Sequence, residues 1–127
     1  MKFDKLINNC GPDSCMPTAI YNLGILLGRQ LDIKEIKQNG STAFECFRTV
    51  LKYFPNAMDI KYHHELEYDS ICIEYYPHSL NGHAWLLFKR NGIYYSHNLI
   101  PDEGLKEHQT NYLFANKHMV GVLGIPP

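Results

Sequence analysis

The sequence predicts an α+β domain, with N-terminal helices packed on an antiparallel sheet. Apolar residues recur at helical spacing over residues 14–27, and again on one face after residue 42. After Pro55 the pattern changes to the alternation that is typical of half-buried strands. An Asn91-Gly92 dipeptide then separates two such strands, which is the sequence signature of a tight hairpin. Helices followed by hairpin-linked strands are the pattern of the α+β class.

Length and composition exclude several classes of function. The chain of 127 residues predicts one domain, 1–127, with a net charge of −1. This charge indicates neither nucleic acid nor an anionic lipid surface as a partner. No apolar run approaches the roughly 18 residues of a membrane span, and residues 1–6 lack an apolar signal core. We therefore expect a cytoplasmic protein with reduced cysteines and no cofactor; the sequence does not address its oligomeric state.

Three helices are expected before Pro55. The first covers residues 14–27, tolerates Pro17 in its first turn and stops at Gly28. Asp32 is a suitable N-cap for a short second helix over residues 33–38. In the third helix Thr42 and Glu45 have capping-box spacing. Its expected apolar face consists of Phe44, Phe47, Leu51 and Phe54.

The second half of the chain predicts five strands. These cover residues 58–62, 70–76, 83–88, 93–97 and 119–125. Residues 99–107 are polar and predict a loop, and residues 111–116 are ambiguous. With the hairpin turn at Asn91-Gly92, residues whose numbers sum to about 183 should face one another.

Two cysteines at the start of the first helix are candidate nucleophiles. Cys10 precedes a Gly-Pro corner, and Cys15 lies inside the predicted helix. Unpaired backbone N–H groups and the positive end of the helix dipole favour a thiolate at such a position. A thiolate nucleophile also needs a base and a group that orients the base.

The predicted hairpin supplies candidates for the base and the orienting group. His83 begins one strand and Asn98 follows the other. By the hairpin arithmetic Asn98 lies opposite Trp85, which puts it about two positions from the direct partner of His83. Side chains at that offset can reach each other, so the amide oxygen of Asn98 could accept the imidazole N–H.

These motifs resemble the papain-like cysteine peptidases, and most closely the bacteriocin-processing peptidases that cleave double-glycine leaders. The matching stretches are Cys10-Gly11-Pro12-Asp13-Ser14, the apolar helix that follows it, and Gly82-His83 before an apolar strand. The resemblance implies a papain-like fold with Cys10 as the nucleophile, His83 as the base and Asn98 as the orienting residue. The order of elements matches over nearly the whole chain, but the matching residues are confined to two short motifs.

The chain departs from that family in three ways. The family's orienting residue is usually Asp, whereas Asn98 matches the choice of papain itself. The family's oxyanion-hole Gln lies six residues before its cysteine, and here that position is Asp4. The available amide donors are instead Asn8 and Asn9. Pro17 would also kink a helix that started at Cys10, because it would lie beyond the first turn.

These departures make Cys15 the rival nucleophile. Its position is compatible with Pro17 in the first turn, and Asn9 lies six residues before it. The Gly-Pro-x-Ser sequence that follows Cys10 is the more specific match, so the sequence favours Cys10.

The sequence therefore predicts a cysteine hydrolase, a peptidase or amidase, that acts on a protein or peptide through a thioester. Acyl transfer and deamidation use the same residues, and a catalytically inactive papain-like binding module is the alternative from another class. A metal site at His63-His64-Glu65 is disfavoured, because adjacent residues of a strand point to opposite faces. The spacing of Cys10 and Cys15 is not that of a thioredoxin-type redox pair.

Overall fold

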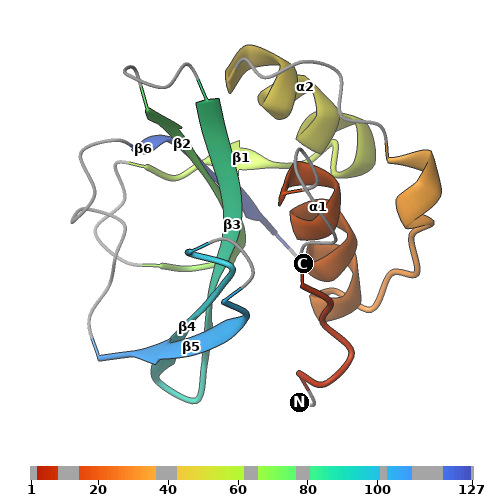
Figure 1. Ribbon diagram of the computed structural model, residues 1–127. Helices are drawn as coiled ribbons and strands as arrows, with labels where there is room; N and C mark the ends of the chain where they lie inside the picture. Colours follow the sequence, from red (N-terminus) through yellow and green to blue (C-terminus); the bar gives the residue numbers. More distant parts are fainter. Residues whose placement is uncertain are drawn as a thin grey trace.

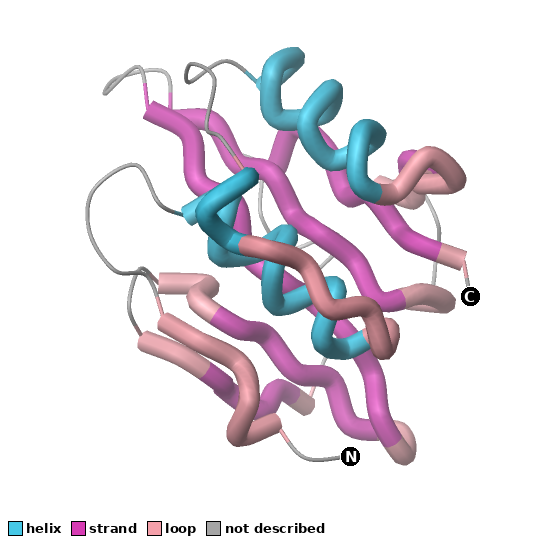
Figure 2. The backbone as a smooth tube through the Cα atoms, turned by 90° about the vertical axis from the view of Figure 1, so that its right-hand side faces the viewer, coloured by secondary structure: helices cyan, strands magenta, loops and turns pink. Residues whose placement is uncertain are grey.

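A computed structural model describes residues 3–8, 15–36, 43–61, 66–76, 81–100, 103–109 and 119–126. In these residues two α-helices pack on one face of a six-stranded antiparallel sheet (Figures 1 and 2), which confirms the α+β class. The strand order is β1-β6-β2-β3-β4-β5. The elements are α1 (Cys15–Leu26), the 3-10 helix η1 (Ile33–Glu35), α2 (Ala43–Tyr53), β1 (Met58–Asp59), β2 (Asp69–Tyr76), β3 (Asn81–Arg90), β4 (Ile93–His97), β5 (Leu105–His108) and β6 (Met119–Ile125).

Helix α1 is the central helix of the fold, and it matches the first predicted helix. It lies over β2 and β3 (Figure 2), and its side chains Ile20 and Leu23 are fully buried there. Pro17 occupies the third position, where its missing N–H costs no intrahelical hydrogen bond. None of the helices in the described part of the chain is long and apolar enough to cross a membrane.

The second predicted helix is shorter than expected. Asp32 does cap it, accepting a hydrogen bond from the backbone N–H of Lys34 at 3.0 Å. The element is a 3-10 helix that ends at Glu35, because Ile36 is extended and turns its side chain into the core. Residues 37 and 38 of the prediction lie outside the described residues.

Helix α2 forms where the sequence predicts it, but it presents a different face to the sheet. Phe44 is 69% exposed and Leu51 is 43% exposed, whereas Val50 and Phe54 are buried. The buried stripe therefore includes Val50 in place of Phe44 and Leu51. The sequence pattern predicted an apolar face from hydrophobicity alone, whereas the packing of α2 in the core buries a neighbouring set of side chains. Thr42 lies outside the described residues.

The predicted hairpin is confirmed in both turn and register. Asn91 and Gly92 have φ values of 53° and 80°, as a type I′ turn requires. The pairs Arg90–Ile93 and Leu86–His97 face each other, and each sums to 183. Strands β2 and β6 also form as predicted.

Two strand predictions were wrong in extent. The strand expected at 58–62 has only the two residues of β1, and the loop expected at 99–107 contains the start of β5. Strand β5 is polar because it is the sheet edge, with three exposed residues and a buried His108. An edge strand needs no apolar alternation to pair with its neighbour. Residues 111–116 lie outside the described residues.

The sheet separates two groups of buried side chains. Ala84, Leu86 and Phe88 on β3 face the helices, with α1 and α2 packed over them. Trp85 and Leu87, which alternate with them, belong to a cluster on the other face with Met119, Val122, Cys72, Ile60 and Leu66. Trp85 and Leu87 thus point away from the helix layer.

The packing of α1 predicts a large difference between two leucines. Leu23→Ala removes a side chain with no exposed surface, so we expect it to lower the free energy of unfolding by about 3 kcal/mol. Leu51→Ala on α2 is the matched control, and its effect should stay within about 0.5 kcal/mol because the side chain is 43% exposed. Urea unfolding of both variants measures the difference; equal losses would contradict this packing.

Candidate active site

Cys15 is the first residue of α1, at the end of the helix where backbone N–H groups lack intrahelical partners. Its side chain is half-buried. The backbone N–H groups of Met16 and Ala84 donate hydrogen bonds to the sulfur, so one comes from its own helix and one from β3. The sulfur thus sits at the junction between the helix start and the sheet.

His83 lies near the beginning of β3 and is 6% exposed. Its imidazole is hydrogen-bonded to the side chain of Cys15. Its Nε2 atom is 2.6 Å from the backbone oxygen of Asn98. A carbonyl oxygen can only accept, so Nε2 carries the proton, and in the neutral ring Nδ1 is left as the nitrogen that can accept the thiol proton.

Asn98 orients His83 through its backbone, which differs from the contact expected from the sequence. Its side-chain oxygen accepts from the N–H of Gly104 at 2.9 Å, and its own N–H donates to the Gly104 oxygen at 3.0 Å. Asn98 has a φ of 58°, a left-handed conformation that Asn tolerates better than most residues. In this turn the side chain of Asn98 bonds to Gly104, and its backbone carbonyl accepts a hydrogen bond from the imidazole of His83.

The hydrogen bond between Cys15 and His83 changes the acidity of both groups. Burial raises the pKa of the Cys15 thiol, but the hydrogen bond with His83, the two backbone N–H groups and the charge of His83 together bring that pKa below its usual value. Burial lowers the pKa of His83, but its bonds to Cys15 and Asn98 and nearby negative charge raise that pKa above its usual value. Both shifts favour a thiolate–imidazolium pair.

The other two cysteines in the described part of the chain have the opposite character. Burial, with smaller contributions from the charges of Cys15 and Glu45, raises the pKa of Cys46 to about 11. Burial raises the pKa of Cys72 well above its usual value, and the charge of Glu74 adds to the effect. Of the three described cysteines, Cys15 is therefore the one whose surroundings favour a thiolate.

The predicted nucleophile Cys10 and the predicted amide donor Asn9 lie outside the described residues. The other predicted donor, Asn8, is exposed and lies against Gly104, where a Cβ would come within 3.2 Å of its side-chain oxygen. Asn8 is therefore next to the loop that carries Asn98.

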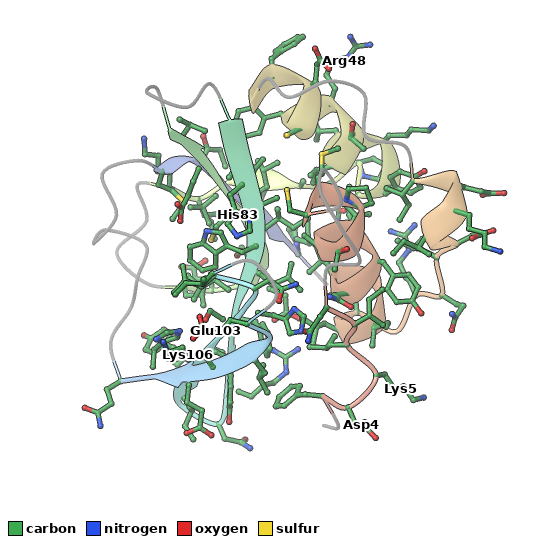
Figure 3. The ribbon with its side chains drawn as sticks, viewed as in Figure 1. Asp4, Lys5, Arg48, His83, Glu103 and Lys106 are labelled. Carbon is green, nitrogen blue, oxygen red and sulfur yellow. The ribbon has the colours of Figure 1, made fainter. Side chains whose placement is uncertain are left out.

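The segment that carries Asn8 is fixed to α1 by its neighbour. The backbone N–H of Ile7 donates to the side-chain oxygen of Asn22 at 2.9 Å, and the Asn22 amide donates to the Ile7 oxygen at 2.8 Å. Asp4, which takes the position of the family's Gln relative to Cys10, is exposed and lies well away from His83 (Figure 3). The structure thus separates Asp4 from the imidazole.

Sequence reasoning missed Glu74, a buried carboxyl group next to His83. Glu74 is the direct cross-strand partner of His83 on β2. It is 2% exposed and accepts a hydrogen bond from the indole Nε1 of Trp85 at 2.7 Å. The alternation over residues 70–76 puts Glu74 on the same face as Cys72, which was the available signal, but the pairing of β2 with β3 was unknown.

Within the described ranges, no three histidine, cysteine or acidic side chains lie close enough together to hold a metal ion. His63, His64 and Glu65 lie outside those ranges. The chemistry available at the junction of α1 and β3 is that of a thiol, an imidazole and backbone hydrogen-bonding groups.

Comparison of the chain with protein-family models, with curated proteins and with solved structures finds no match.

Proposed function

We propose that the protein is a cysteine-nucleophile hydrolase with a papain-like arrangement, in which Cys15 is the nucleophile and His83 the base. The observation that carries the proposal is the hydrogen bond between the Cys15 sulfur and His83, whose far nitrogen is held by Asn98. A cysteine at the start of the central helix and a histidine near the start of a sheet strand support the papain-like assignment. This choice replaces Cys10, the nucleophile that the sequence favoured.

The proposed reaction begins from the thiolate–imidazolium pair. The Cys15 thiolate attacks a carbonyl carbon of a peptide or amide, and the imidazolium of His83 gives its proton to the leaving nitrogen. The resulting thioester is then hydrolysed by a water that His83 deprotonates. Transfer of the acyl group to an amine instead of water would use the same residues.

The developing oxyanion needs hydrogen-bond donors close to the sulfur. The N-terminal end of α1 supplies backbone N–H groups, and the exposed amide of Asn8 lies beside the Asn98 loop. We assign the oxyanion to these donors, with Asn9 as a further candidate from the sequence. A reactive thiolate also requires a reducing compartment, so a cytoplasmic location goes with this proposal.

The first prediction concerns which cysteine reacts. At pH 6.5 iodoacetamide should alkylate Cys15 roughly tenfold faster than a free thiol, because a thiol of ordinary pKa is only about 1% ionised there. Intact mass and peptide mapping measure the rate and the site. Cys15→Ser should abolish the fast phase, and Cys46→Ala is the matched control that should leave it unchanged. Fast labelling at Cys10 would return the role to that residue, and the absence of a fast phase would favour the inactive binding module.

The second prediction concerns pH. The alkylation rate should rise in two steps, the first below the usual pKa of a thiol as Cys15 ionises, and the second above the usual pKa of imidazole as His83 loses its proton. His83→Ala removes the hydrogen bond and the positive charge but leaves the burial of the sulfur. It should therefore give one step, moved to higher pH. A variant profile that overlays the wild-type profile would show that His83 does not assist Cys15.

The third prediction separates the backbone of Asn98 from its side chain. Asn98→Gly keeps the left-handed turn and the carbonyl that accepts from His83, whereas Asn98→Ala strains the turn by about 1–2 kcal/mol. Both lose the side-chain bond to Gly104. The alkylation rate of Cys15 should consequently fall less in Asn98→Gly than in Asn98→Ala. Equal losses would mean that the amide side chain orients the ring.

A further inference from the structure

Glu74 is a buried acidic residue that the proposed reaction does not use. Its side chain is 2% exposed in the middle of the sheet. Moving a carboxylate out of water is costly unless other groups compensate it, and an apolar residue at such a position is often neutral or more stabilising. The indole N–H of Trp85 compensates it in part, through the hydrogen bond of 2.7 Å. A carboxyl group kept in this position calls for a physical reason.

The position of Glu74 in the sheet supplies that reason. Glu74 and His83 are direct partners in the antiparallel pairing of β2 with β3, so their side chains share one face of the sheet. Trp85, two residues along β3 from His83, is on the same face and holds the carboxyl group. The carboxyl group and the imidazole are therefore neighbours that a rigid part of the sheet keeps together.

The other edge of β2 has an irregularity at the same residue. The pairing with β6 passes from Ile73–Gly121 to Glu74–Met119, which leaves Val120 without a partner. The extra residue belongs to β6, and bulges of this kind are common beside active sites. The bulge in β6 lies opposite Glu74, which is paired with His83 on its other side.

Glu74 is the acidic side chain that faces His83 among the described residues. The group that orients the ring is the backbone carbonyl of Asn98, which carries no net charge. Among the described residues, the ionisable groups that face His83 are Cys15 from α1 and Glu74 from β2, and Cys72 on the same face of β2 stays a neutral thiol. Burial lowers the pKa of His83, and the charge of Glu74 is one of the contributions that raise it.

We propose that Glu74 is a positioning residue of the active site, whose carboxylate, held by Trp85, supplies the negative charge that keeps His83 as an imidazolium beside the Cys15 thiolate. This proposal rests on the proposed function. In other cysteine and serine triads an Asp both stabilises the imidazolium and orients the ring. Here Glu74 would stabilise the imidazolium, and Asn98 would orient the ring.

The test is the titration of His83 in Glu74→Gln, followed by NMR of the imidazole. Gln has nearly the same shape and still offers an oxygen to Trp85, so the substitution removes mainly the charge. The His83 pKa should fall, because the substitution removes a neighbouring negative charge that raises it. The second step of the Cys15 alkylation profile, in which His83 loses its proton, should move to lower pH with it. Glu67→Gln, at an exposed position before β2, is the matched control and should change neither.

A purely structural role for Glu74 would lower the melting temperature in Glu74→Gln without moving the titration of His83, and this result overturns the proposal. If Glu74→Gln does not fold, Trp85→Phe gives the second test. It removes the donor that fixes the carboxylate, so the His83 pKa should fall in the same direction by a smaller amount. An unchanged pKa in the folded Trp85→Phe protein also overturns the proposal.

The two proposals fail in different ways. If Cys15 shows no fast alkylation in the wild-type protein but Glu74→Gln still lowers the His83 pKa, the cysteine chemistry fails and the Glu74–His83 coupling stands. If Cys15 reacts fast and Glu74→Gln leaves both titration steps in place, the cysteine chemistry stands and the role of Glu74 is refuted.

Discussion

The hydrogen bond between the Cys15 sulfur and His83 is the interaction on which the proposed chemistry depends, because it joins the two layers of the fold. One partner belongs to the start of α1 and the other to the start of β3. Their distance is therefore set by how α1 packs across the sheet. The fully buried Ile20 and Leu23 hold that packing, and Asn22 ties the preceding segment to the same helix.

The turn after β4 shows how an imidazole can be oriented by a backbone group. Asn98 uses its side chain to close the loop on Gly104 and its carbonyl to accept from His83. A backbone carbonyl fixes the tautomer, since its oxygen can only accept from the imidazole N–H. What the position demands of the residue is the left-handed conformation, which Asn and Gly adopt at low cost.

A second contact between a hydroxyl and an imidazole shows why Cys15 and His83 stand out. Ser96 Oγ lies 2.6 Å from His108 Nε2 on β4 and β5, but the Ser96 side chain has no exposed surface. A substrate carbonyl could not reach that hydroxyl without opening the sheet. Burial, together with the charge of Lys106, lowers the pKa of His108. The half-buried Cys15 has both the acid–base partner and an exposed part of its side chain.

The sequence by itself determined the local elements and the pairing within the hairpin. Helical periodicity defined α1, and Asn91-Gly92 determined the register of β3 and β4, because the type I′ turn leaves one way to pair the strands. That register brought Asn98 within reach of His83. The pattern of residues also predicted a thiol nucleophile at the helix start, where the structure places Cys15.

Only the tertiary structure decided which groups meet across elements. It placed Cys15 against His83, turned the carbonyl of Asn98 rather than its amide to the ring, and set Glu74 beside His83. The face that α2 buries was likewise decided by its packing. None of these follows from local patterns, because each depends on the relative placement of segments distant in the chain. Periodicity specifies which side of an element is apolar; it does not specify the neighbour that covers it.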